Sequence, residues 1–360
     1  STMAIKYKWL AGKLRELIEK DIKAGIEKLP TEQALCTRYH VSRQTVRQAL
    51  SLLEKERLIV RKQGSGSYIT GVLSDPDKNN IYILVPSDQQ YIYPVILNDI
   101  RSELSRNGFS CSICVTHNRI DLEYRILSDL LAAPPRGIIA EGCKTVLPNP
   151  NLEVYRQLMK KGTSVVFLHN YYPSLPESLY VKDDNTAGSA MLVRYLAGQG
   201  HTAIGGIFKT DDLQGIERYQ GFAETMRALH LHISDDRTGW FDSRDQNALE
   251  SHGDTAFLRR IAEESLNSCT AVICYNDMIA YYLLRELRQA GYHLPDDMAV
   301  TAFDNTYLSN YGPLSITTLA HRPHEMGTKA AQTVINKMRG LPVNSQEIPW
   351  SLNLKESTRN

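Results

Sequence analysis

The sequence predicts an α/β protein with a winged helix-turn-helix domain at its N-terminus, followed by a two-lobed body of doubly wound parallel sheets. Three observations lead to this fold class. Residues 29–50 have the pattern of two short helices joined by a tight turn, and residues 57–70 read as a strand pair with a glycine turn. From Ile81 onward, short apolar runs alternate with segments of helical period, which is typical of sheets wound by right-handed crossovers.

The N-terminal unit begins with a helix expected over residues 5–24, in which apolar side chains recur along one face. These side chains are Leu10, Leu14, Leu17 and Ile18. Thr31, directly after Pro30, is placed to cap the next helix, and Ser42 is placed to cap the third. The third helix should cover a small core with the apolar residues Val46, Ala49, Leu50 and Leu53.

The opposite face of the third helix carries side chains that can read base edges. Arg43 and Arg47 are four residues apart and therefore share one face, with Gln44 between them. Arginine and glutamine can form bidentate hydrogen bonds with guanine and adenine. The alternative is an ordinary solvated helix face, which two arginines alone would favour.

The flanking segments favour nucleic-acid binding. A basic strand over 57–62 leads into a small-residue turn over 63–66, which is small enough to approach a DNA groove closely. Lys6, near the start of the first helix, is placed to contact a phosphate. The predicted DNA contacts are Lys6, Glu32, Ser42, Arg43, Gln44, Thr45, Arg47, Gln63, Gly64 and Gly66.

Three motifs in this unit resemble the signature of the GntR-type winged helix. They are Leu29-Pro30-Thr31-Glu32, the run Val41-Ser42-Arg43-Gln44-Thr45-Val46-Arg47, and Gly64-Ser65-Gly66-Ser67-Tyr68. The resemblance implies a DNA-binding domain over residues 1–70, a linker over 71–80 and a separate domain over 81–360. One position departs from the pattern, because Gln33 stands where many family members carry arginine.

Charge is unevenly distributed along the chain. Residues 1–70 contain 14 Lys and Arg against 7 Asp and Glu, a net charge of +7, whereas the whole chain carries +1, so the remainder carries −6. A basic head on an acidic body is typical of a nucleic-acid-binding module joined to a part that does not bind nucleic acid.

Apolar runs and cysteine usage bear on the compartment. The sequence contains no run of 18 apolar residues, so no transmembrane helix is expected, and no apolar signal segment is visible. The pair Cys111 and Cys114 has redox or zinc spacing, but neither a second pair nor a histidine cluster follows it. We therefore expect reduced structural thiols in a cytoplasmic protein.

The body alternates between expected strands and expected helices. The strands are placed at 81–85, 109–115, 137–140, 164–168, 203–208, 271–274 and 299–303, and the helices at 95–106, 122–133, 152–161, 187–198, 217–229, 248–266 and 278–290. This number of elements is too large for one small sheet, so two lobes with a cleft between them are expected.

Ligands in such folds bind beyond the carboxyl ends of the strands. Carboxylates, amides, cationic groups and aromatic rings follow these strand ends, and such a set suits a saccharide. Taken singly, each such residue could equally be a capping or loop residue.

The body also resembles the LacI/GalR-type effector domain, which is similar to periplasmic sugar-binding proteins. The motifs are Gly200-His201 with Ile204-Gly205, Arg218 with Gly221-Phe222, Cys274-Tyr275-Asn276-Asp277, and Phe303-Asp304-Asn305. The fusion of such a body to a GntR-type head resembles the AraR-type arabinose repressors of Gram-positive bacteria. That resemblance implies a repressor released from operator DNA by L-arabinose. It makes Arg218, Asn276, Asp277 and Asp304 the first candidates for sugar ligands, followed by Lys209, Glu141 and Tyr91.

Other classes are less favoured by the sequence. A GntR-type head fused to a pyridoxal-phosphate enzyme would need a longer chain, and a sugar transport protein would lack the basic head. The same architecture could respond to another sugar or act as an activator. Gly12-Lys13 lacks the phosphate-loop context, and His321 and His324 lack metalloprotease spacing. We therefore expect no enzyme activity, cofactor or metal. A homodimer is expected, because symmetric regulators pair to read palindromic operators.

Overall fold

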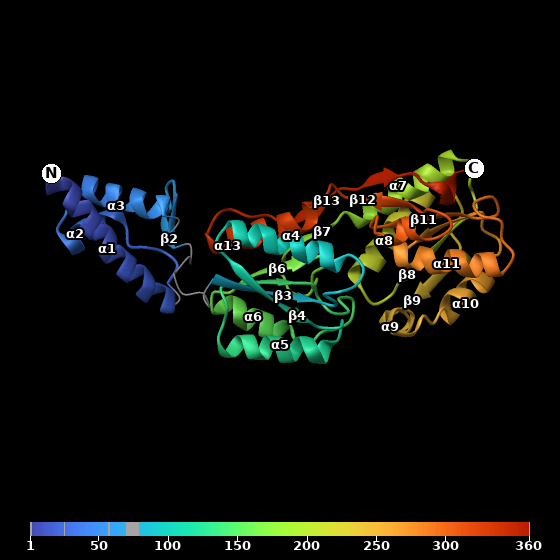
Figure 1. Cartoon of the computed structure of the whole chain (residues 1–360), viewed down its shortest axis with the longest axis horizontal. Helices are drawn as coiled ribbons and strands as arrows, with labels where there is room; N and C mark the ends of the chain where they lie inside the picture. The colour runs from blue at the N-terminus through green and yellow to red at the C-terminus, as the bar shows by residue number, and fades with distance from the viewer. Residues whose placement is uncertain (1, 25, 57, 70–78, 360) are drawn as a thin grey trace.

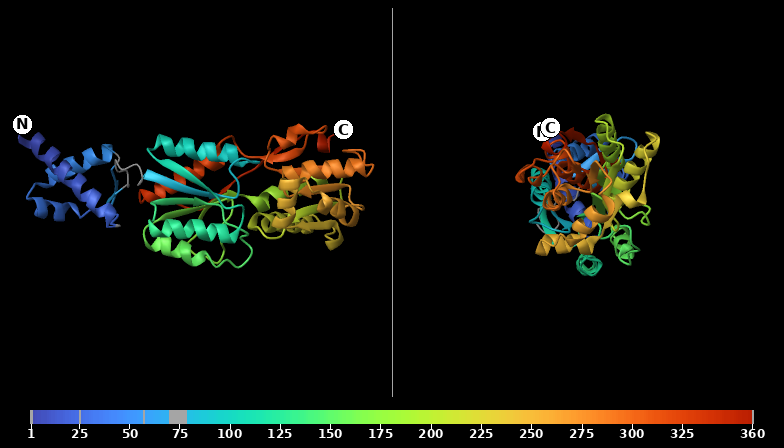
Figure 2. Two further views of the ribbon diagram at one scale, coloured as in Figure 1. Left: turned by 60° about the horizontal axis from the view of Figure 1, so that its bottom comes forward. Right: turned by 90° about the vertical axis from the view of Figure 1, so that its right-hand side faces the viewer.

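The computed structural model describes residues 2–24, 26–56, 58–69 and 79–359, and places a small head and two lobes in a row (Figure 1; Figure 2). The N-terminus lies at the free end of the head, and the C-terminus lies on the distal lobe (Figure 1). The predicted linker at 71–80 falls outside the described residues except for its last two positions. The predicted fold class, a winged helix-turn-helix followed by two parallel-sheet lobes, is confirmed.

The head consists of α1 (Thr2–Lys23), α2 (Glu32–Tyr39), α3 (Arg43–Lys55) and the antiparallel pair β1 (Ile59–Lys62) and β2 (Gly66–Ile69). Both predicted caps are confirmed, because the Thr31 hydroxyl accepts from Ala34 N at 3.2 Å and the Ser42 hydroxyl accepts from Thr45 N at 3.2 Å. The predicted apolar faces of α1 and α3 pack together in one buried core.

Lobe 1 is a sheet of six strands in the described residues, with the order β13-β7-β6-β5-β3-β4 and parallel pairing throughout. Helices α4 and α13 pack on one face of this sheet, and α5 and α6 pack on the other. The strands are β3 (Asn80–Val85), β4 (Ser110–Val115), β5 (Gly137–Ala140), β6 (Ser164–Leu168), β7 (Leu179–Asp183) and β13 (Gln346–Ile348). The helices are α4 (Tyr93–Arg106), α5 (Ile120–Ala132), α6 (Leu152–Lys160) and α13 (Glu325–Met338).

Lobe 2 is the second sheet of six strands, with the order β14-β12-β11-β10-β8-β9, in which β14 alone runs antiparallel to its neighbour within the described sheet. Helices α7 and α8 cover one face, and α10 and α11 cover the other. The strands are β8 (Ile204–Lys209), β9 (Thr238–Phe241), β10 (Ala271–Cys274), β11 (Ala299–Phe303), β12 (Thr317–Ala320) and β14 (Ser351–Asn353). The helices are α7 (Asn185–Gly198), α8 (Leu213–Ala228), α9 (Ser243–His252), α10 (Ala256–Ser265), α11 (Asp277–Gln289) and α12 (Leu308–Tyr311).

One predicted helix is wrong, and several elements were not predicted. The segment 248–266 forms two helices, because Gly253 adopts a left-handed conformation with φ of 62° and ends α9 before α10 begins. Strands β7, β9 and β12 and helix α13 were missed, as were the short strands β13 and β14. All of these strands are three to five residues long, so their apolar period is too brief to stand out.

The described chain passes between the lobes at three places. It leaves β7 of lobe 1 for α7 of lobe 2, returns from β12 to α13, and leaves β13 for β14. These three segments lie at 183–185, 320–325 and 348–351. Each lobe is therefore built from separate parts of the sequence, and the lobes can change their relative orientation only by bending at these segments.

Close packing of α7 against α8 yields a stability prediction. A Cβ at Gly221 would lie 2.3 Å from the carbonyl oxygen of Thr186, which belongs to the backbone of the other helix. We expect Gly221→Ala to lower the free energy of unfolding by about 1–3 kcal/mol, because the helices must separate. Gly198→Ala is the matched control, since a Cβ there meets nothing within 4 Å. Urea unfolding of both variants checks this, and equal midpoints would contradict it.

The cysteines are all free thiols. Cys111 packs against the core under α4 and α13, whereas Cys114 packs against the core under α5 and α6. The two side chains therefore lie on opposite faces of β4 and cannot reach each other, despite their spacing. Across the described residues, no helix combines the length and apolar character that crossing a bilayer requires.

Candidate DNA-reading surface and interlobe site

The exposed face of α3 presents the arginines and the glutamine that the sequence selected. Arg43, Gln44 and Arg47 are all exposed. Arg43 donates to the Gln33 side chain at 2.9 Å, and Arg47 donates to the Glu32 carboxylate at 3.2 Å. Both arginines are therefore oriented from α2, and Gln33, which departs from the family pattern, has a partner on the recognition helix.

Ser42 and Thr45 contribute mainly to helix geometry. Thr45 is 3% exposed, and its hydroxyl lies 2.9 Å from that of Ser42. We therefore propose no DNA contact for Thr45, although the sequence predicted one. The sequence could not separate these positions, since buried and exposed threonines look alike in a helical pattern.

The wing places small residues at its tip. Gln63, Gly64 and Gly66 are exposed, and both glycines have positive φ values, 74° and 117°. Behind the tip, Lys28 lies close enough that a Cβ at Gly66 would come within 2.8 Å of its side chain. Lys6, on the exposed side of α1, is available for a phosphate contact. Lys28 was missed by sequence reasoning, because only the folded wing brings it beside the turn.

Tyr91 joins the two lobes through its hydroxyl group. It lies in lobe 1 after β3, yet it donates to the Asp304 carboxylate at 2.6 Å and accepts from Asp277 N at 3.1 Å, both in lobe 2. Burial, together with the charges of Asp304 and Asp277, raises the pKa of Tyr91, so its hydroxyl stays protonated and able to donate. Two of the predicted ligands, Tyr91 and Asp304, therefore meet across the lobe boundary.

Arg218 is the central cation of the interlobe site. It is 3% exposed, and its guanidinium donates to Asn185 at 2.9 Å and to Tyr275 O at 2.5 Å. Its remaining amino group lies 3.7 Å from Asp183 and 3.7 Å from Asp304, one carboxylate from each lobe. The Phe303 ring lies 4.1 Å from the guanidinium carbon. Hydrogen bonds, two carboxylates and an aromatic ring therefore hold the Arg218 guanidinium in place between the lobes.

A second cluster follows β8. Lys209 is buried and pairs with the Asp212 carboxylate, and Asp211 lies 3.9 Å away. Burial, opposed by Lys209, leaves the pKa of Asp212 raised. In this cluster three buried oxygens have no hydrogen-bond donor among the described atoms: Asp211 Oδ1, Asp212 Oδ1 and Gln214 Oε1. Unpartnered buried acceptors are costly, so these atoms call for donors from water or from a ligand.

Glu141 of lobe 1 faces this cluster with two aromatic partners. It accepts from the Tyr93 hydroxyl at 2.6 Å and pairs with His169 Nδ1. Burial lowers the pKa of His169, but the Glu141 carboxylate outweighs this and raises it. We use the name interlobe site for the residues Tyr91, Tyr93, Glu141, His169, Asp183, Lys209, Asp211, Asp212, Gln214, Arg218, Tyr275 and Asp304. Seven of these residues were not among the predicted ligands, and each of them ends a strand or follows one: Tyr93, His169, Asp183, Asp211, Asp212, Gln214 and Tyr275.

Comparison with known proteins identifies the family. Residues 6–69 match the model of the bacterial regulatory proteins of the gntR family, and residues 193–358 match that of the periplasmic binding protein-like domain. The arabinose metabolism transcriptional repressor of Halalkalibacterium halodurans is 30% identical over 342 residues, which cover 93% of this chain and 89% of that protein. The protein of the same name from Geobacillus stearothermophilus is 32% identical over 311 residues, covering 86% and 84%. The chain belongs to this family of repressors.

Solved structures show the same fold as this repressor. A complex of the transcriptional regulator CelR with cellobiose has a TM-score of 0.67 at 19% identity, covering 88% of this chain and 91% of that one. The regulator CcpA of Lactococcus lactis has a TM-score of 0.67 at 17% identity, covering 78% and 99%. The predicted fusion of a GntR-type head to a LacI-type body is thereby confirmed.

The side chains of two predicted sugar ligands of the repressor accept hydrogen bonds from neighbouring protein groups instead. Asn276 caps α11 by accepting from Ile279 N at 2.9 Å. Asp277 accepts from the backbone and hydroxyl of Thr306, at 2.6 and 3.0 Å, and from the Thr318 hydroxyl at 2.6 Å. Burial and neighbouring Asp304 raise the pKa of Asp277 to about 7. These contacts brace the loop after β11, which carries Asp304.

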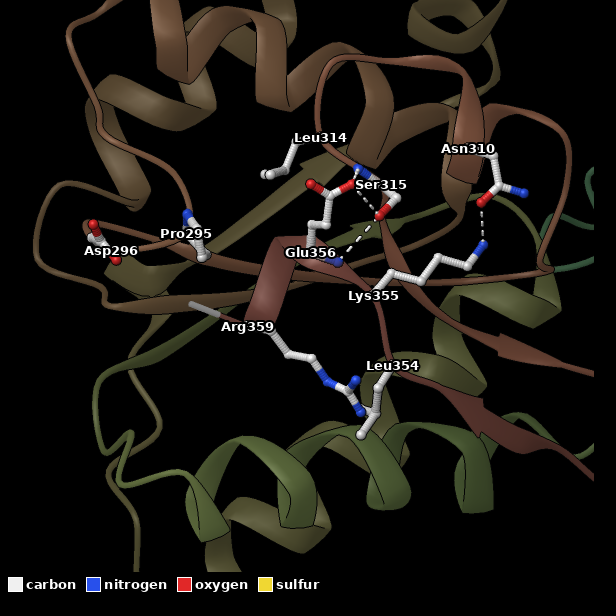
Figure 3. A pocket seen from close by; sticks show the side chains of 9 residues that line it. All are labelled: Pro295, Asp296, Asn310, Leu314, Ser315, Leu354, Lys355, Glu356 and Arg359. Carbon is white, nitrogen blue, oxygen red and sulfur yellow. Dashed lines mark hydrogen bonds between the residues drawn. The ribbon is translucent and has the colours of Figure 1, made fainter.

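A separate surface hollow lies on lobe 2 of the repressor, outside the interlobe site (Figure 3). Its volume is about 900 Å³. Two of its charged side chains are already paired, since Lys355 donates to Asn310 at 2.8 Å and Glu356 accepts from the Ser315 hydroxyl at 2.8 Å (Figure 3). None of the predicted effector ligands lines this hollow, so the interlobe site is the better candidate.

Proposed function

We propose that this chain is a cytoplasmic, homodimeric repressor that binds operator DNA through its head and is released when L-arabinose occupies the interlobe site. The carrying observation is the group of buried acceptors at Asp211, Asp212 and Gln214, which lack donors. Sugar hydroxyls donate and accept hydrogen bonds, so a monosaccharide can satisfy them. The names of the two bacterial relatives support arabinose as that sugar.

Further features support a ligand that bridges the lobes. Lobe 1 offers the Glu141 carboxylate and lobe 2 offers the Lys209 ammonium. The rings of Tyr93, beside Glu141, and of Tyr275, beside Arg218, are the aromatic groups that we propose for the apolar face of a sugar. A sugar held by both lobes favours one lobe orientation over another. Release follows only if the sugar binds the DNA-free state more tightly, and by linkage operator DNA must weaken sugar binding by the same factor.

Calorimetry with L-arabinose, together with operator gel shifts, tests this function. We expect heat of binding with L-arabinose and loss of the operator complex at the same concentrations. D-xylose, L-ribose, D-galactose and cellobiose serve as comparison sugars. The absence of heat with L-arabinose would refute the assignment of the effector, and sugar binding without operator release would refute the switch.

Gln214 provides a specific prediction on affinity. Its side-chain oxygen is buried and unpartnered, so Gln214→Leu costs little in the free protein but removes an acceptor for the sugar. We expect the Kd for L-arabinose to rise about tenfold to a hundredfold, equivalent to about 1–3 kcal/mol. Gln220→Leu on the exposed side of α8 is the control, and its affinity should match wild type. Equal affinities for both variants would remove Gln214 from the site.

The proposed homodimer is supported by exposed aromatic side chains on lobe 2. Tyr307, directly before α12, and Tyr311, the last residue of α12, are 60% and 74% exposed and pack edge to face. Large apolar groups of this kind are typical of surfaces covered by a partner. We expect sedimentation equilibrium of the full chain to give twice the monomer mass of 40.6 kDa. A monomer bound to DNA without a symmetric footprint would contradict the proposal.

A further inference from the structure

The three segments that connect the lobes meet at one side chain. His321 lies in the segment between β12 and α13. Its Nε2 lies 2.5 Å from Asp183, at the end of β7, and its Nδ1 lies 2.9 Å from Pro349 O, between β13 and β14. Its ring stacks on Trp350, with centroids 3.6 Å apart and an angle of 16°. His321 thus contacts both other connecting segments.

The hydrogen-bond partners determine the charge of this ring. A proline carbonyl can only accept, and an ionised carboxylate can only accept, so both ring nitrogens must donate. Asp183 is ionised because His321, His169 and Arg218 surround it; against the effect of burial, these groups lower its pKa. Burial lowers the pKa of His321, but the bond and charge of Asp183 and the bond to Pro349 outweigh it, and the pKa is raised. His321 is therefore an imidazolium at neutral pH.

The same carboxylate connects this ring to the central cation of the interlobe site. Asp183 presents one oxygen to His321 and its other oxygen to Arg218, 3.7 Å away. Arg218 also faces Asp304, and the Trp350 ring that stacks on His321 lies 5.9 Å from the guanidinium carbon. A movement of the connecting segments that displaces His321 must therefore also displace Asp183 relative to Arg218.

We propose that His321 is a positioning residue of the switch: as an imidazolium it ties the three connecting segments together and keeps Asp183 directed at Arg218. This inference rests on the proposed function, because it assigns His321 a role in the response to the sugar bound there. His321 itself touches no ligand in this scheme. It fixes the lobe orientation in which the interlobe site binds L-arabinose.

Two substitutions separate the contributions of charge and shape. His321→Leu removes both donors and the charge, and we expect the Kd for L-arabinose to rise at least tenfold while operator binding without sugar changes less than twofold. His321→Gln keeps one donor for Asp183 without charge, so its affinity should lie between those of wild type and His321→Leu. His324→Asn is the matched control, since His324 lies in the same connecting segment but pairs with Asp99 of α4 at 2.7 Å and with neither of the other two segments in the described hydrogen bonds, and it should behave like wild type.

The pH profile distinguishes this role from a merely structural one. A raised pKa means that the imidazolium contribution is complete at low pH and is lost as pH rises through the folded pKa. L-arabinose affinity of the wild type should therefore fall at alkaline pH, and that of His321→Gln should fall less, because only His169 of the two imidazoles then remains to titrate. The other charged groups facing His321 are Asp183, whose pKa is lowered by His321 against the effect of burial, Arg218, whose pKa its carboxylate partners raise against the effect of burial, and Asp304, whose pKa is raised by burial. His169, whose pKa Glu141 raises against the effect of burial, titrates in both proteins, so the difference between the two profiles is the contribution of His321.

The ring charge is also measurable without sugar. In ¹⁵N spectra of the full-length protein at pH 7, assigned by difference from His321→Gln, both ring nitrogens of His321 should be protonated. A deprotonated nitrogen overturns the proposal, as does wild-type sugar affinity in His321→Leu or a pH profile unchanged in His321→Gln. If the wild type binds no L-arabinose, the proposed function fails and the positioning role fails with it, while the ring charge still tests whether His321 ties the three connecting segments together as an imidazolium.

Discussion

Arg218→Ala should abolish the response to sugar and produce a repressor that stays on its operator. Removing the guanidinium leaves Asp183 and Asp304 buried without their shared cation. We expect the Kd for L-arabinose to rise more than about a hundredfold, and the free energy of unfolding to fall by about 3–5 kcal/mol, because Asp304 then lacks a cation and Asp183 keeps only His321. Calorimetry, urea unfolding and operator gel shifts measure the three quantities on one preparation.

The controls separate ligand binding from support of the helix. Arg227→Ala removes an exposed arginine near the end of the same helix and should leave all three quantities unchanged. Arg218→Lys keeps the positive charge but cannot donate to both Asn185 and Tyr275 O, so it should regain stability without regaining full sugar affinity. If Arg218→Ala instead loses stability and operator affinity together while still binding sugar, Arg218 only braces α8.

Arg47→Ala should weaken operator binding by about 1–3 kcal/mol and relax the preference at one base position. Arg47 is the more exposed partner in its pair with Glu32, whose carboxylate holds it at 3.2 Å on the outer face of α3. We therefore propose that its guanidinium is already oriented when α3 enters the major groove. Competition gel shifts against operators with single base-pair changes measure both effects.

Lys6→Ala is the control for a contact that reads no sequence. It should weaken operator and random DNA alike and reduce the slope of binding against salt by about one. An equal loss on operator and random DNA with Arg47→Ala would assign Arg47 to the phosphate backbone. Arg43→Ala, which frees Gln33, should resemble Arg47→Ala and act at a different base pair.

Local patterns determined much of the fold. The head was predicted almost element by element, because its caps at Thr31 and Ser42 act on amides three residues away. Most predicted elements of the body also match the structure, because the apolar pattern of a buried strand or an amphipathic helix is recognisable within about ten residues. The prediction failed for two reasons. Strands β9 and β12 have four residues each, which is too few for a recognisable apolar pattern. Gly253 ends a helix within a segment whose apolar period continues through it.

The candidate site was predicted in its parts but not in its arrangement. The strand-end rule and the family resemblance selected Arg218, Asp304 and Tyr91, and all three lie in the interlobe site. The same reasoning could not distinguish Asp277, whose carboxylate is occupied by Thr306 and Thr318, from Asp212, which retains an unpartnered oxygen. Both are acidic residues just beyond a strand, and only their neighbours in space differ.

The sequence by itself determined a basic winged helix-turn-helix joined to an acidic α/β body, and the chemical character of its strand ends. These properties depend on residue type and short spacing. The tertiary structure alone decided that Tyr91 meets Asp304, 213 residues away, and that His321 meets Asp183, 138 residues away. Such pairs form because the chain passes between two separately packed lobes at three places, and the geometry of that packing is not written in any local pattern.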